Sequence, residues 1–356
     1  MNDAPMTGGT IIDSIIKGLR WLDRQIKVVM SPAQQQVSAS VPAELSDEQL
    51  HQAIHEVGAE LLNRHGPLLQ DSFARGGATL SDPRFPAALP VTVRPHVLMM
   101  VTQANDSYGL ALLGLREHAT ASALGPIRNV AETYAYVKWL LESPDENVRL
   151  GRAYRLTLDA IDQLREQKRM LERVSPGSEV TLQVAPMLGV AVERMTSRLK
   201  ELAQEDSVTV AAKPRRSELL EKHLLDSGGY LFYSLLSNAG VHSGAGRSQA
   251  FYGRPGKAVI DFDFKGLHHI RAYWVSVNIR LYLDLCDLAE PVIGGPEWKT
   301  LTGATRAKLE PLAHEAQQRY LGRIQQEMAS VSTWANLPSL ERRLSGTDDT
   351  TVDESS

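Results

Sequence analysis

The sequence predicts an all-α protein, a helical bundle of about eight to ten helices without a substantial sheet. Three observations support this fold class. Apolar residues recur at helical spacing through most of the chain after residue 94, and the breaks between these stretches carry glycine or proline. Only VIDFDF, residues 259–264, alternates as a strand does. The 356 residues are 43% hydrophobic, which is ample for two domains or for one large core.

The first 93 residues are expected to precede the main bundle. Residues 10–30 are predicted to form an amphipathic helix that packs on the protein or on a partner, although its partly basic polar face also suits a membrane surface. A Gln/Ser/Pro-rich linker follows, and then a helix over 46–64 and a loop with several prolines. The expected segments are therefore 1–45, 46–93, the main bundle over 94–330, and a mostly disordered acidic tail over 331–356.

Eight helices are predicted between residues 94 and 330. They are expected near 94–121, 126–142, 145–174, 187–205, 216–225, 228–240, 265–290 and 303–330. Helix breakers such as Gly125-Pro126, Ser143-Pro144 and Gly294-Gly295-Pro296 separate them.

Composition and charge narrow the class of protein. The net charge of -4 provides no overall basic field for nucleic acid, so such a contact would need a local patch. Cys286 is the only cysteine, which excludes an internal disulfide and a cysteine zinc cluster. No apolar run approaches the roughly 20 residues of a membrane span, and the N-terminus lacks the pattern of a secretory signal. We therefore expect a cytoplasmic protein without a cofactor or a metal site.

Arg128 and Glu132 are four positions apart on the predicted helix over 126–142. This spacing places both side chains on one face, where they can form a helical ion pair. Apolar residues cover much of the remaining circumference, which favours a central helix and a partly buried pair. Each charge then requires the other, because an isolated buried charge is very costly.

On the next predicted helix, Arg149, Arg152 and Arg155 recur every three residues and form a basic stripe. One interpretation is a solvated helix face, and the other is a stripe that faces phosphate. Under the second interpretation Arg155 is a candidate binding residue.

The stretch YSLLSNAGVHSGAGRS, residues 233–248, joins the end of an apolar helix to a segment rich in glycine. Its candidate binding residues are Tyr233, Ser237, Asn238 and Arg247, and His242 is a candidate catalytic residue. A glycine at the helix end would let His242 fold back toward Ser237. In the alternative interpretation, His242 only caps free carbonyl groups at a helix C-terminus.

The order of these motifs resembles that in a bacterial all-helical family whose domain is catalogued as being of unknown function. The residues that carry the resemblance are Arg128-x3-Glu132, then WLLESP, then YSLLSNAGVHS, and it spans roughly residues 94–290. That family is distantly similar to the HEPN superfamily of helical bundles, many of whose members are metal-independent ribonucleases in defence and toxin systems. Arg216 and His223 match the Arg/His spacing of that superfamily, but chance alone gives about two such matches in this chain.

Two functional hypotheses follow. The first is a helical binding or regulatory protein of unknown ligand, a homodimer, which the resemblance would place in a bacterial stress or defence system. The second is a metal-independent endoribonuclease or a nucleotide-binding protein, with RNA or a nucleotide as its partner. In the second, His242 acts as general acid or base, Arg128 or Arg155 stabilises phosphate charge, and Glu132 orients the arginine.

Overall fold

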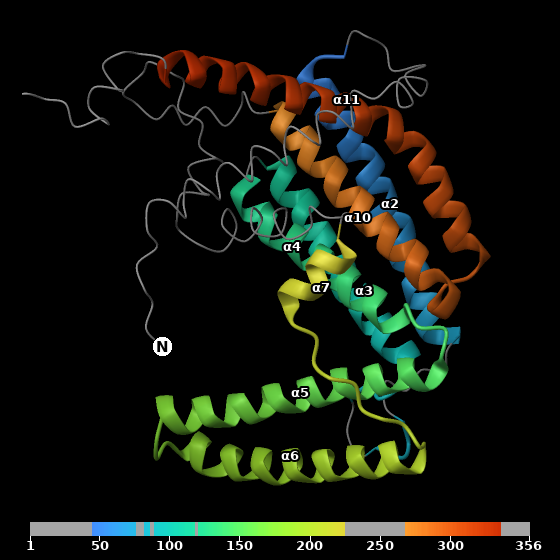
Figure 1. The fold of residues 1–356 in the computed structure, drawn as a ribbon, viewed down its shortest axis with the longest axis vertical. Coiled ribbons are helices and arrows are strands. Elements are labelled where there is room, and N and C mark those ends of the chain that lie inside the picture. Colours follow the sequence, from blue (N-terminus) through green and yellow to red (C-terminus); the bar gives the residue numbers. More distant parts are fainter. Residues whose placement is uncertain (1–44, 76–81, 86–88, 118–119, 225–267, 336–356) are drawn as a thin grey trace, which may run out of the picture.

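The computed structural model describes residues 45–75, 82–85, 89–117, 120–224 and 268–335. These residues form eight α-helices and contain no strand (Figure 1). The prediction of an all-α helical bundle is therefore confirmed. None of the helices in these ranges is both long enough and apolar enough to cross a membrane.

Five helices share one hydrophobic core. They are α2 (Asp47–Arg75), α3 (Val93–Arg116), α4 (Thr120–Leu141), α10 (His268–Ile293) and α11 (Pro296–Ala335). The central helix is α10, since it packs against each of the other four. Its buried residues surround the helix axis instead of forming one stripe, which is the pattern of a fully enclosed helix.

The helix α2 belongs to this bundle, which corrects the expectation of a separate segment over 46–93. It also continues through Gly66-Pro67 to Arg75, where the sequence predicted a loop. A proline inside a helix costs roughly 3 kcal/mol, because it removes a hydrogen bond and its ring crowds the preceding turn. Here Pro67 is exposed while Leu61 and Leu69 are buried, so core packing on both sides of the proline offsets that cost.

Two other helices begin earlier than predicted, for the same reason. The helix α4 starts at Thr120 and includes Pro126, and α6 starts at Glu179 and includes Pro186. At the C-terminal end, α11 spans Pro296–Ala335, which is longer than the predicted 303–330. Tertiary packing thus decided helix length at positions where local breakers suggested an end.

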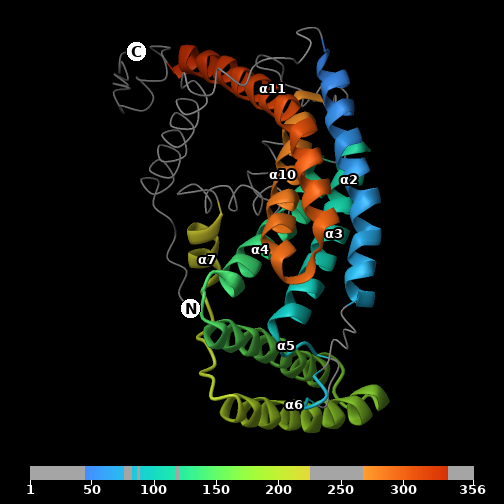
Figure 2. The same ribbon diagram turned by 90° about the vertical axis from the view of Figure 1, so that its right-hand side faces the viewer.

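The helices α5 (Glu146–Val174) and α6 (Glu179–Glu205) form an antiparallel hairpin that lies across one end of the bundle (Figures 1 and 2). Asp145 and Ser178 cap their N-termini by accepting hydrogen bonds from backbone N–H groups. A second, smaller core joins the two helices. The short helix α7 (Arg216–His223) returns from the hairpin to pack on α4.

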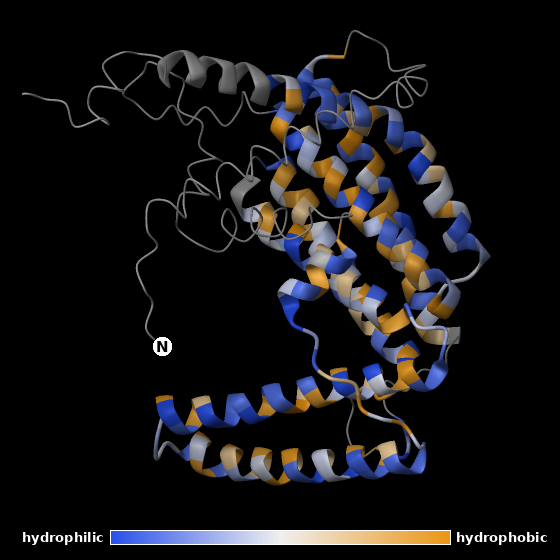
Figure 3. Cartoon of the chain, in the orientation of Figure 1, coloured by the Kyte–Doolittle hydropathy of each residue, from blue (hydrophilic) through white to orange (hydrophobic). Residues whose placement is uncertain are grey.

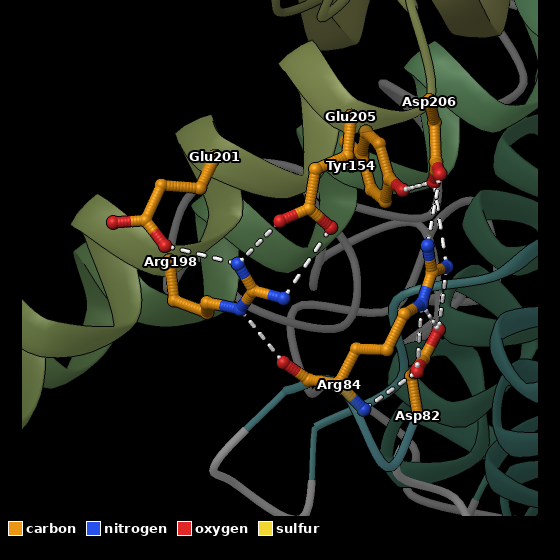
Figure 4. A network of polar contacts seen from close by, with 7 residues as sticks. All are labelled: Asp82, Arg84, Tyr154, Arg198, Glu201, Glu205 and Asp206. Atoms are coloured by element: carbon orange, nitrogen blue, oxygen red, sulfur yellow. Dashed lines mark hydrogen bonds and ion pairs between the residues drawn. The ribbon is translucent and has the colours of Figure 1, made fainter.

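A network of ion pairs and hydrogen bonds connects the hairpin to the segment at 82–85 (Figure 4). The guanidinium of Arg84 donates to the carboxylates of Asp82, at 2.9 Å, and Asp206, at 2.8 Å. The hydroxyl of Tyr154 donates to the same Asp206 carboxylate. Arg198 donates from Nε to the backbone carbonyl of Arg84 at 2.8 Å. The network therefore joins both hairpin helices to the connection between α2 and α3.

Candidate ligand pocket

A cavity of about 640 Å³ lies where the bundle meets the hairpin. Its walls come from α3, α4 and α5, and from the segment that leads from α6 into α7. The apolar lining consists of Leu89, Pro90, Met99, Met100, Leu156 and Ala160, and Tyr136 adds an aromatic ring. Uncharged polar side chains come from Gln103, Ser107, Asn129, Thr133 and Gln163. The volume is within the range of small-molecule sites, and the lining is more polar than in most of them.

Glu132 provides one of the two carboxylates that line the cavity. Arg128, one helical turn earlier on α4, donates from Nε to Oε1 at 2.7 Å, and the side chains are 14% and 11% exposed. Arg216 at the start of α7 donates to the other carboxylate oxygen. The predicted partly buried pair is therefore present, and a second arginine from a distant part of the chain completes it.

Asp159 provides the second carboxylate, and its surroundings repeat those of Glu132. Arg155, one turn earlier on α5, donates from Nε to Oδ1 at 2.9 Å. Lys213 places its Nζ 3.3 Å from the same oxygen. Each cavity carboxylate therefore contacts one arginine of its own helix and one cation from the return of the chain after α6, Lys213 in the connection and Arg216 at the start of α7.

The close approach of that segment to α5 depends on Gly151. A Cβ atom at this position would lie 2.2 Å from the backbone carbonyl oxygen of Thr209, which no side chain can tolerate. The Ala211 N–H also donates to the Gly151 carbonyl at 3.1 Å. A residue without a side chain thus lets the chain cross α5 closely and bring Lys213 and Arg216 to the cavity.

His96 of α3 is an ionisable residue at the apolar side of the cavity. Its Nε2 lies 3.1 Å from the hydroxyl of Thr157, which donates to the Pro90 carbonyl at 2.6 Å. The Ala153 carbonyl lies 3.1 Å from the same hydroxyl. With the single hydroxyl hydrogen directed to one of these two carbonyls, Nε2 is the donor to the hydroxyl oxygen. Burial lowers the pKa of His96 to about 4, so the imidazole is neutral at pH 7. This histidine positions neighbouring groups and adds no charge for a ligand.

The candidate residues have different positions in the structure. Arg128 and Glu132 lie together at the cavity, and Arg155 reaches it through Asp159. Tyr233, Ser237, Asn238, His242 and Arg247 lie outside the described residues. The convergence of Arg128 and Glu132 with Ser237 and His242 therefore stays a prediction.

The predicted basic stripe on α5 faces carboxylates. Arg149 pairs with Glu146 at 3.5 Å, and Arg152 pairs with Glu142 at 3.1 Å. The side chains of Arg152 and Arg155 are only 15% and 16% exposed, so the stripe is not a solvated face. It is not an open phosphate-facing row either, because each arginine contacts an acid.

Several residues that line the cavity were not found from the sequence. They are His96, Tyr136, Asp159, Lys213 and Arg216. One signal was available, since Arg155 and Asp159 have the same four-residue spacing as Arg128 and Glu132. The contributions of Lys213 and Arg216 had no local signal, because they depend on how the chain returns from the hairpin.

Elsewhere in the described ranges, no three His, Cys, Asp or Glu side chains come together as a metal site would need. Cys286 is fully buried in the bundle, and burial raises the pKa of its thiol, so it is not a reactive nucleophile.

Comparison with protein-family models, with curated proteins and with solved structures found no match to this chain.

Proposed function

We propose that the protein is a helical binding protein that holds a small organic anion in the cavity between the bundle and the hairpin. The observation that carries the proposal is the placement of two cations, Lys213 and Arg216, at a cavity that apolar side chains also line. A ligand with a phosphate or carboxylate and an apolar body would satisfy both parts of the lining.

The balance of charge favours an anionic ligand. Four cations contact the two cavity carboxylates: Arg128 and Arg216 at Glu132, and Arg155 and Lys213 at Asp159. Asp162 also approaches Arg155, but it pairs in addition with Arg165. Lys213 and Arg216 balance the two carboxylates in the lining itself, and Arg128 and Arg155 behind these carboxylates make the whole group of ion pairs positive.

Lys213 and Arg216 are suited to contact the anion directly. Their side chains are 60% and 53% exposed, whereas Arg128 and Arg155 are largely buried in their ion pairs. A guanidinium has five N–H donors and an ammonium has three, so contact with one carboxylate leaves donors for an incoming phosphate.

Calorimetric titration with phenylphosphate and AMP tests this function, with phenol and adenosine as uncharged counterparts. We expect both anions to bind and both neutral compounds to bind at least 10-fold more weakly. Arg216→Gln should weaken anion binding by about 10-fold or more, since it removes a charged hydrogen bond. Arg215→Gln is the matched control, because Arg215 is adjacent, is 81% exposed and pairs with Glu218 outside the cavity lining.

Three results would reject the proposal. They are no binding of either anion at millimolar concentration, equal binding by both variants, and preferential binding of the cation spermidine.

A second candidate function is cleavage of RNA without metal, as the resemblance to the HEPN-like family implies. The positive charge of the whole group of ion pairs at the cavity also favours it, because phosphate is the group that such an enzyme must stabilise. RNA should then be cleaved in the presence of a chelator by the wild type, and much more slowly by His242→Ala and Arg128→Ala. Equal cleavage by all three proteins, or none, would remove this candidate.

A further inference from the structure

The helix α6 has two apolar stripes, and α5 covers one of them. The covered stripe contains Thr181, Ala185, Val192, Met195, Leu199 and Leu202. These residues recur mostly at intervals of three and four, as in helices that pack in parallel or antiparallel pairs. Val192, Met195, Leu199 and Leu202 belong to the second core, together with Tyr154 and Ile161 of α5.

The other stripe of α6 is exposed, and we call it the outer stripe. It consists of Val180, Val184, Met187 and Val190, whose exposed fractions are 61%, 37%, 72% and 48%. With about 100° per residue, these positions centre roughly 100° away from the covered stripe. Exposed apolar side chains that form a row are typical of an interaction surface, whereas single ones are common anywhere.

The outer stripe is in the part of the molecule that projects farthest from the bundle. Both ribbon views place α5 between α6 and the bundle, so α6 forms the outer edge (Figures 1 and 2). Apolar residues are concentrated in the first half of α6, next to the turn from α5 (Figure 3). A second molecule can therefore approach this half of α6 without meeting the described helices of the bundle.

We propose that two copies of this chain associate through the outer stripe, with their α6 helices antiparallel and related by a two-fold axis. In that arrangement Val184 of one copy faces Met187 of the other. Val180 faces Ala191, which is half-buried and lies beside Val190 at the edge of the second core. A two-fold interface requires a surface that is complementary to itself. The spacing of the outer stripe meets this requirement, because the contact of Val184 with Met187 and the contact of Val180 with Ala191 each occur twice, once on either side of the two-fold axis.

The charges beside the outer stripe favour the same antiparallel pairing. Glu179 precedes the stripe and Arg194 follows it, and both are exposed. Antiparallel alignment places Arg194 of one copy about two residues, or roughly 3 Å along the axis, from Glu179 of the other. The pairing thus forms two such contacts, one at each end, whereas parallel alignment would place like charges together.

Sedimentation equilibrium of the full chain tests the proposal, with Met187→Glu as the disrupting variant. We expect a dimer for the wild type and a monomer for Met187→Glu at the same concentration, because the substitution buries two like charges close to the axis. Leu182→Glu is the matched control, since Leu182 is 66% exposed on α6 but lies away from the outer stripe. It should remain a dimer.

A charge exchange provides a second measurement that does not alter the apolar residues. Glu179→Arg should raise the dimer dissociation constant several-fold, and combining it with Arg194→Glu should restore the original value. A monomeric wild type, a dimer that Met187→Glu leaves intact, or equal effects of Met187→Glu and Leu182→Glu would overturn the proposal. Binding of anions in the cavity is measured separately and does not enter this test.

Discussion

The bundle and the α5–α6 hairpin use the same kind of helix but are stabilised in different ways. In the bundle, α10 is enclosed on all sides, and some of the polar groups buried there form hydrogen bonds with one another. His65 and Tyr282 form a buried hydrogen bond of 2.7 Å, and the Tyr282 hydroxyl donates to Asn105 at 2.7 Å. In the hairpin, one narrow apolar seam joins two helices whose other faces are charged or exposed.

This difference shows why the cavity lies between the two regions. The bundle supplies walls that are fixed by a deep core, and the hairpin supplies Asp159 and leads into the segment with Lys213 and Arg216. Contacts between the hairpin and the bundle are sparse compared with contacts inside the bundle. The predictions below test whether the two regions differ in stability as their packing implies.

The largest expected effect compares two fully buried isoleucines, Ile279 of α10 and Ile161 of α5. Truncation to alanine removes the same atoms at both sites, but a site that cannot collapse retains a larger cavity. We expect Ile279→Ala to lower the free energy of unfolding by about 4–5 kcal/mol and Ile161→Ala by about 2 kcal/mol. Urea denaturation gives both values. Equal losses would mean that the hairpin is packed as rigidly as the bundle.

The next effect is a loss of bundle stability in mild acid. Burial lowers the pKa of His51, His65 and His96 to about 4. The unfolded chain has the ordinary value of about 6.5, so it binds more protons below that pH. The contribution of each such histidine to the free energy of unfolding is therefore fully present above pH 6.5 and decreases as the pH drops toward 4. At pH 5 the loss is about 2 kcal/mol for each histidine.

Denaturation of His65→Gln at pH 7 and pH 5 checks this prediction. The difference between the two unfolding free energies should be about 2 kcal/mol smaller than in the wild type. The hairpin helices, residues 146–205, contain no histidine and provide an internal comparison by hydrogen exchange. If His65→Gln had the same pH dependence of unfolding as the wild type, protonation of His65 would not be a cause of the acid destabilisation.

The smallest effect concerns the ion network of the hairpin. Arg84→Met removes the contacts with Asp82 and Asp206, but the arginine side chain is 43% exposed. Exposed ion pairs contribute about 1 kcal/mol or less, so the loss of stability should lie in that range and decrease with added salt. Exchange of amide hydrogens should accelerate near Asp206 and stay constant in α10. A loss above about 3 kcal/mol would show that the ion pairs stabilise the hairpin more than the apolar contacts between α5 and α6 do.

The sequence predicted the fold class and most helix positions because these depend on apolar periodicity. The helix over 146–174 was predicted within one residue, since Ser143-Pro144 and Ser175-Pro176 bound it. The start of α6 and the length of α2 were wrong, because Pro186 and Pro67 lie inside helices whose buried faces continue past them. A proline or glycine indicates a free-energy cost for continuing the helix, and tertiary packing decides whether the helix continues in spite of it.

The candidate site was predicted in part. Arg128 and Glu132 were found because one helix brings them together. Arg216 and Lys213 were not found as cavity residues, because their position depends on the close passage over Gly151 and not on any local spacing.

The position of Arg215 and Arg216, where the connection from α6 ends and α7 begins, has a practical consequence. Both side chains are exposed, and residues 208–215, which end at Arg215, are not helical. Trypsin cleaves after arginine in irregular chain, so this connection is a natural place for the protease to act. An anion bound by Arg216 would shield that bond, and the rate of tryptic cleavage would then report occupancy of the cavity without any label.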